Sequence, residues 1–112
     1  MVGPKILNSA RITRVDGDIQ AFDSSLMTYK ILAGSYPSSQ QGFEALVNRP
    51  SSPPVPRRWE KQLDNVPIDP WGNEYLYRYP GSKDPSRPEV ISLGPDGEEG
   101  TQDDISNQDP RG

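Results

Sequence analysis

Apolar residues recur every three or four positions through the first third of the chain. The recurring set is Ile12, Val15, Ile19, Phe22, Leu26 and Tyr29. Alternating steps of three and four residues place all of them on one stripe of a helix. The pattern predicts a helix from about residue 5 to residue 32, within the segment 1–33, with this stripe facing the core.

The remaining positions of this segment support the same helix. The residues between the apolar ones predict a polar back, formed by Arg14, Asp16, Asp18, Gln20, Asp23 and Thr28. Pro4 suits the first turn, because the missing N–H of proline has no intrahelical partner there. Gly34 and the following Tyr36-Pro37 mark the end, because the residue before a proline avoids the helical region.

A second, shorter helix is predicted over residues 38–48. Ser38 and Gln41 have the spacing of a capping box, and an apolar edge follows at Phe43, Leu46 and Val47. Residues 50–57 contain four prolines and no periodicity, which predicts an extended connection on the surface. Beyond this connection, apolar side chains are expected to pin the chain to the core at Trp59, Leu63 and Val66.

The hydrophobic period changes from helical spacing to alternation in the segment 69–93. Asp69-Pro70-Trp71-Gly72 has the chemistry of a turn, and Trp71 is expected to reach the core. A strand is predicted from Glu74 to Tyr79, with tyrosines at alternate positions on one face. A second strand, Glu89 to Leu93, can pair with it in antiparallel fashion. The order of elements predicts one α+β domain over residues 1–112, with an antiparallel sheet packed on the long helix.

Composition limits the chemistry available to this domain. Val, Ile, Leu and Phe together number 22 of 112 residues, so the core is thin. The chain has no cysteine and no histidine, which removes disulfides, the commonest zinc ligands and every histidine-dependent triad. Nucleic acid is not expected as a partner, since the chain has a net charge of −4 and no basic stripe. An enzyme that relies on carboxylates alone is a minor alternative.

The acidic residues concentrate after the second predicted strand. The segment 93–105 contains five carboxylates and no basic residue, and its three glycines allow the backbone to fold tightly. Carboxylates brought together in this way favour a cation with oxygen ligands, and the flexible geometry of calcium suits such a loop better than the strict octahedron of magnesium. A solvated acidic segment without a ligand is the alternative that the residues leave open.

Four stretches, in this order, resemble the major pseudopilin of bacterial type II secretion. They are Val2-Gly3-Pro4-Lys5, the segment from Tyr29-Lys30 through Gly34 to Val47, Asp69-Pro70-Trp71-Gly72-Asn73-Glu74-Tyr75, and Ser92-Leu93-Gly94-Pro95-Asp96-Gly97 through Asp103-Asp104-Ile105. The resemblance implies a pilin-like fold and a calcium site in the last loop. It also implies the ligands: the side chains of Asp96, Asp103 and Asp104, with the backbone oxygens of Leu93 and Thr101. Glu98 and Glu99 fall in the variable part of that loop and are expected to be exposed.

The resemblance further implies a structural role without catalysis. Copies of the full-length protein would assemble into a helical filament in the periplasm, together with minor pseudopilins and an inner-membrane assembly platform. The family's leader and apolar N-terminal helix are not recognisable in this sequence, so we expect a soluble periplasmic part that is monomeric by itself, with the membrane reached only through the missing helix. The alternatives are another pilin-like subunit, such as a type IV pilin or a minor pseudopilin, and a free-standing extracellular calcium-binding recognition module.

Overall fold

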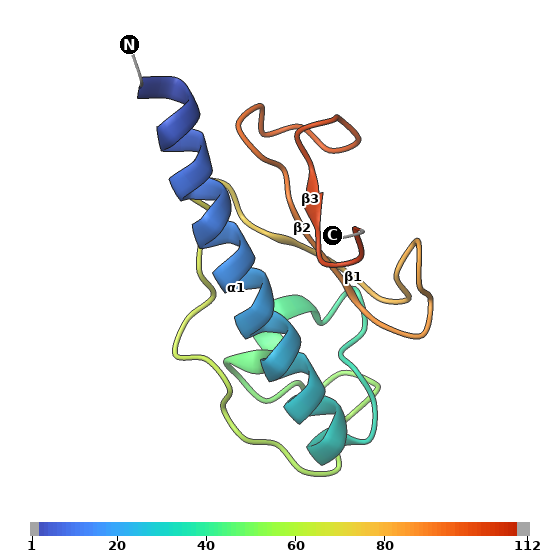
Figure 1. Cartoon of the computed structure of the whole chain (residues 1–112). Coiled ribbons are helices and arrows are strands. Elements are labelled where there is room, and N and C mark those ends of the chain that lie inside the picture. The colour runs from blue at the N-terminus through green and yellow to red at the C-terminus, as the bar shows by residue number, and fades with distance from the viewer. Residues whose placement is uncertain (1–2, 110–112) are drawn as a thin grey trace.

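One long helix runs the length of the molecule, and the rest of the chain folds back along it (Figure 1). The computed structural model describes residues 3–109, with side chains described from residue 9. Helix α1 spans Gly3–Ala33, and the short 3₁₀ helix η1 spans Gly42–Leu46. The strands are β1 (Leu76–Arg78), β2 (Glu89–Ser92) and β3 (Ile105–Ser106). This arrangement confirms the predicted α+β class, with a long helix on a small antiparallel sheet.

The apolar stripe of α1 forms the centre of the core. Five of its six residues are at most 3% exposed: Val15, Ile19, Phe22, Leu26 and Tyr29. The prediction that Ile12 belongs to the core is wrong, because this residue is 42% exposed. The N-terminal end of α1 extends beyond the sheet (Figure 1), so too little of the chain covers that turn. α1 ends as predicted at Gly34, which has φ of +98° and donates its N–H to the Lys30 carbonyl oxygen at 2.8 Å.

Some residues of the predicted polar back contact the rest of the domain. The Tyr75 hydroxyl donates to Asp18 Oδ2 at 2.6 Å, and Asn107 Nδ2 donates to Asp23 Oδ1 at 2.8 Å. Arg14 also donates to the carbonyl oxygen of Ile68. At 100° per residue these positions border the apolar stripe, so their side chains reach the segments that cover it. These three residues of the polar back therefore help to hold the covering segments on α1.

The predicted second helix is shorter and tighter than expected. The capping box exists, because Gln41 N donates to Ser38 Oγ at 3.1 Å and Ser38 N donates to Gln41 Oε1 at 3.0 Å. Only the five residues of η1 are helical, however, instead of residues 38–48. Gly42 adopts φ of +61°, a left-handed conformation that keeps the capping turn from continuing into an α-helix.

The three strands pair in the order β1-β2-β3, and both pairs are antiparallel. Tyr77 lies opposite Val90, and Ile91 lies opposite Ser106. β1 is shorter than the predicted strand Glu74–Tyr79, and Glu74 forms only an isolated bridge with Ile68. The third strand was not predicted, because two residues are too few to show an alternating pattern.

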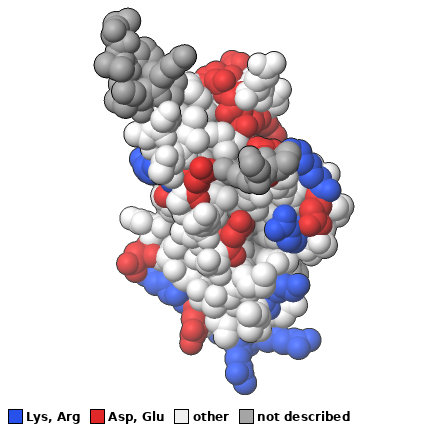
Figure 2. Space-filling model, viewed as in Figure 1, with Lys and Arg blue, Asp and Glu red and all other residues white. Residues whose placement is uncertain are grey.

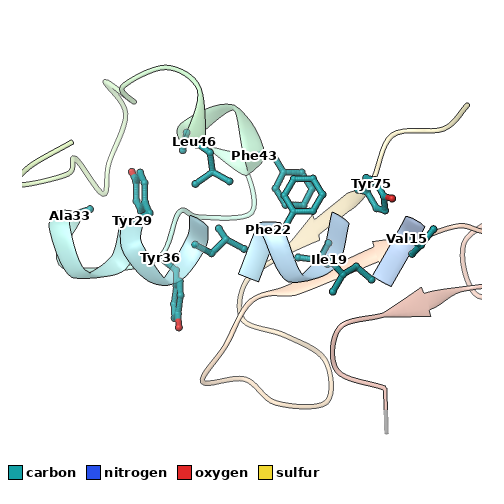
Figure 3. Close-up of a cluster of buried hydrophobic side chains, with 12 residues drawn as sticks. Val15, Ile19, Phe22, Tyr29, Ala33, Tyr36, Phe43, Leu46 and Tyr75 are labelled. Carbon is teal, nitrogen blue, oxygen red and sulfur yellow. The ribbon is translucent and has the colours of Figure 1, made fainter. Parts of the chain in front are cut away.

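Aromatic rings join the sheet to the helices at the centre of the core (Figure 3). Phe22 of α1 stacks on Phe43 of η1 at 4.2 Å between ring centroids and meets the ring of Tyr75 edge-on at 5.2 Å. Tyr77 packs on the same cluster and donates its hydroxyl to the Pro37 carbonyl oxygen at 2.7 Å. The predicted tyrosine face of the first strand therefore packs against the helices.

The proline-rich segment 50–57 lies on the surface, as predicted, and its residues are exposed except for the half-buried Pro50 and the buried Pro56. Its last part crosses the end of α1, where the backbone N–H of Arg57 donates to the Ala33 carbonyl oxygen at 3.2 Å. The predicted apolar contacts that follow are confirmed, since Trp59, Leu63 and Val66 are partly buried against the core. Within residues 3–109, no helix combines the length and the hydropathy that crossing a bilayer requires.

Candidate functional site

The acidic loop connects β2 to β3 and closes tightly on itself. Its three glycines, Gly94, Gly97 and Gly100, have φ values of +72°, +66° and +86°. A Cβ atom added at Gly94 would collide with the carbonyl oxygen of Asp103 and lie 2.9 Å from the Asp103 Cβ. The two ends of the loop are therefore in direct contact, and glycine is required where they meet.

The predicted ligand Asp96 is held by donors from its own turn. Asp96 Oδ1 accepts a hydrogen bond from the backbone N–H of Glu98 at 3.0 Å. This bond, with a further contribution from the Thr101 hydroxyl, lowers the pKa of Asp96 below its ordinary value. Asp96 and Thr101 are thus near neighbours, while the carboxylate itself is exposed to solvent.

The two neighbouring aspartates at the end of the loop are half-buried. The backbone N–H of Asp103 donates to Thr101 Oγ1 at 3.3 Å, and that of Asp104 donates to the Thr101 carbonyl oxygen, also at 3.3 Å. Asp104 Oδ2 accepts from the backbone N–H of Gly100 at 2.7 Å. Asp104 Oδ1 is buried and has no hydrogen-bond partner in the described part of the chain.

The predicted ligands are gathered in one loop, but their carboxylates do not converge on one point. Among residues 3–109, no three acidic side chains lie close enough together to hold a metal ion. The chemistry of the set nevertheless fits a hard cation, because every candidate donor is an oxygen. The unpaired, buried Asp104 Oδ1 fits as well, since a buried carboxylate oxygen without a donor is costly unless a cation or water satisfies it.

Two residues outside the loop, Asp69 and Asn73, contact it, and no sequence pattern indicates this contact. Asp69, in the turn before the sheet, is 3% exposed and accepts a hydrogen bond from the Ser92 hydroxyl at 3.1 Å. The same hydroxyl accepts from the N–H of Gly94 at 3.2 Å. Asn73 of that turn approaches Gly97, since its Nδ2 lies 3.1 Å from an added Cβ there. The turn around Asp69 was recognisable from the sequence, but the contact of Asp69 with Ser92 was not.

The opposite side of the loop is tied to the sheet. Glu99 forms an ion pair with Arg78 of β1, and both side chains are about half exposed. Glu98 and Glu99 are exposed, as predicted. An exposed pair of this kind contributes about 0–1 kcal/mol to stability, so it orients the loop more than it stabilises the domain.

A buried carboxylate lies beneath this pair. Glu89 of β2 is 4% exposed and accepts hydrogen bonds from the Ser82 hydroxyl at 2.6 Å and the Ser106 hydroxyl at 3.0 Å. Burial raises the pKa of Glu89, but the hydrogen bonds from Ser82 and Ser106 outweigh it, so the net pKa lies below the ordinary value. Glu89 therefore links β2 to β3 through Ser106, the second residue of β3.

Comparison with known proteins gives consistent matches over nearly the whole chain. The family model for type II secretion system (T2SS), protein G, matches residues 5–108. Type II secretion system core protein G of Pseudomonas aeruginosa is 44% identical over 117 residues, which cover 97% of this chain and 81% of that protein. The protein of the same name from Escherichia coli K12 is 41% identical over 92 residues, which cover 80% of this chain and 62% of the relative.

A solved structure agrees with this result. The crystal structure of the major pseudopilin from the type 2 secretion system of enterohaemorrhagic Escherichia coli superimposes with a TM-score of 0.84. The match covers 96% of this chain and 92% of that one, at 34% sequence identity.

Proposed function

Because the chain belongs to the protein G family of the type II secretion system, we propose that it is the periplasmic part of a major pseudopilin that builds a pseudopilus shaft. Its role is that of a structural subunit. Copies of the full-length protein assemble helically, with minor pseudopilins and an inner-membrane platform as partners, and the filament helps to export folded proteins. The match over residues 5–108, with a TM-score of 0.84 to a solved major pseudopilin, is the observation that carries this proposal.

Complementation tests this role. Residues 5–112 would be joined behind the N-terminal segment of the Pseudomonas relative and expressed in a strain that lacks its own protein G. The expected result is filaments that contain this chain, and renewed export of a protein secreted by that system. A stable chimera that restores neither filaments nor export would refute the proposal, and the strain's own protein G serves as the positive control.

We also propose that the acidic loop binds calcium. Asp96, Asp103 and Asp104 would supply carboxylate oxygens, and Leu93 and Thr101 would supply backbone oxygens. The unpaired Oδ1 of Asp104 and the direct contact between the two ends of the loop support this site. A bound calcium ion supplies positive charge that offsets the repulsion among these carboxylates. The loop would then hold β3 and the sheet edge in place.

Thermal unfolding in calcium and in chelator tests the site. At a calcium concentration about ten times the dissociation constant, mass action adds about 1.4 kcal/mol of stability. This raises the Tm by about 6 °C in a domain of this size. Asp104→Asn should abolish the response, whereas Glu98→Gln removes the same charge from the loop and should preserve it. An equal Tm in calcium and chelator, or equal loss of the response in both variants, would overturn the site.

A further inference from the structure

The two ends of the molecule differ in charge, while side chains of both signs lie between them (Figure 2). Residues 94–104 contribute five carboxylates and no cation, and acidic side chains gather at the top of the view, at the level of the N-terminal half of α1. Basic side chains gather at the opposite end, where α1 ends. The molecule measures 54 × 28 × 24 Å, so the two groups lie far apart. Such a distribution is suited to end-to-end electrostatic attraction between copies.

The basic end is built around the last turn of α1. Lys30 lies in that turn. Arg57 and Arg58 are held across the helix end, because their backbone N–H groups donate to the carbonyl oxygens of Ala33 and Leu32, each at 3.2 Å. Arg49 joins them through a hydrogen bond of 3.4 Å to the Pro56 carbonyl oxygen. Four cations therefore share one end of the molecule, and a helix C-terminus, which carries partial negative charge, favours them there.

These cations have no acidic partner among the side chains that the structure describes. In the described residues, none of the four forms an ion pair. Arg57 and Arg58 are exposed and line a hollow of about 390 Å³ with Ile31. Ile31 is 74% exposed, so the hollow has an apolar wall beside its two guanidinium groups. Apolar surface beside unpaired positive charge fits a partner that combines acidic and apolar groups.

We propose that this hollow is the docking surface for the acidic loop of a second copy of the chain. The loop carries Glu98 and the exposed Pro95 near its tip, which match the guanidinium groups and the apolar wall in chemistry. A calcium ion contributes two positive charges against five negative ones, so three negative charges remain for the contact. The inference rests on the proposed function, and it identifies how successive subunits of the filament meet.

The positions of the two surfaces favour an open assembly. A contact between different surfaces at opposite ends of a subunit repeats without closing, and it produces a filament when the rotation does not form a ring. Copies whose α1 helices point the same way place the loop of one subunit toward the hollow of the next. An antiparallel dimer could also pair the two ends, but it would stop at two copies.

Engineered cysteines separate these arrangements, because the chain has no cysteine of its own. Arg58→Cys and Glu98→Cys would be combined in the filament-forming chimera and oxidised in cells. A head-to-tail contact gives a ladder of disulfide-linked multimers in the double variant and no ladder in either single variant. A product limited to dimers, or no disulfide at all in filaments that do form, would overturn the inference.

Charge reversal supplies a second readout. Arg58→Glu is expected to lower filament yield about tenfold, and the exchange Arg58→Glu with Glu98→Arg should recover it. Arg11→Glu is the matched control, since Arg11 is an exposed cation of α1 that forms no ion pair in the described residues. Tm values of the isolated domains confirm that each variant folds. Equal filament yields for Arg58→Glu and Arg11→Glu would refute the docking surface and leave the filament role intact. A parent chimera that forms no filaments would refute both the docking surface and the filament role.

Discussion

Asp69 offers the sharpest test of how this domain holds its acidic loop. Its carboxylate accepts three hydrogen bonds: from the backbone N–H groups of Trp71 at 3.0 Å and Asn73 at 2.8 Å, and from the Ser92 hydroxyl at 3.1 Å. Each hydrogen bond to a charged group is worth about 1.5–3 kcal/mol. Because Trp71 and Asn73 are half-buried, water can reach their N–H groups after truncation. We therefore expect Asp69→Ala to lower the free energy of unfolding by about 4 kcal/mol.

Replacement by asparagine separates the turn from the loop. Asp69→Asn keeps one acceptor oxygen for the two N–H groups and disturbs only the contact with Ser92, so it should cost about 1–2 kcal/mol. Urea unfolding at 25 °C measures both values, and in thermal unfolding the alanine variant should lose about 16 °C of Tm. Asp64→Ala removes an exposed carboxylate and should change stability by less than about 0.5 kcal/mol. A loss below about 1 kcal/mol for Asp69→Ala, or equal losses for Asp69→Ala and Asp69→Asn, would refute the reasoning.

Three further predictions concern the core, the loop and pH. Phe22→Ala should destabilise the domain by about 3–5 kcal/mol in urea unfolding, because the ring is 1% exposed and packs on two other aromatic rings; a cost below about 1 kcal/mol would contradict this packing. Gly94→Ala should unfold the loop and abolish the calcium response, because the added Cβ would collide with the Asp103 backbone. Gly100→Ala has open space around its Cβ and should cost only about 1 kcal/mol of stability for its positive φ. Equal effects of the two variants on Tm would argue against the contact between Gly94 and Asp103. The pKa of Glu89 is lower in the folded than in the unfolded chain, so its contribution to stability is present above the unfolded pKa and is lost as pH falls through the folded pKa. Glu89→Gln should therefore reduce the loss of stability at acid pH. An unchanged acid dependence of stability would contradict this role of Glu89.

Local sequence patterns determined the long helix, its buried face and the turn before the sheet. The spacing from Val15 to Tyr29 predicted α1 and its buried face, and Gly34 predicted its end. The turn at Asp69 to Gly72 was also recognisable, because Gly72 has φ of +89° and its N–H donates to the Asp69 carbonyl oxygen at 3.0 Å. These features depend on residues within a few positions of one another, so helical periodicity and turn chemistry reveal them directly.

Features that depend on contacts distant in sequence were missed or misplaced. Ile12 continues the apolar period of α1, yet nothing in the period indicates where the sheet stops covering the helix. β3 has only two residues, and its pairing with β2 decides that it is a strand. The short η1 likewise shows that a correct capping box does not fix the length of the helix that follows it.

The candidate site divides in the same way. The acidic residues of the loop and the three glycines were evident from the sequence, as was an all-oxygen donor set suited to calcium. The sequence could not show that Ser92 joins the loop to Asp69, 23 residues earlier, or that Asn107 reaches back 84 residues to Asp23. It also could not place Arg57 and Arg58 at the end of the molecule opposite the acidic loop. Neighbouring residues encode the elements and their chemical character. The contacts between distant residues arise only when packing of the core brings their segments together, so the tertiary structure alone decided them.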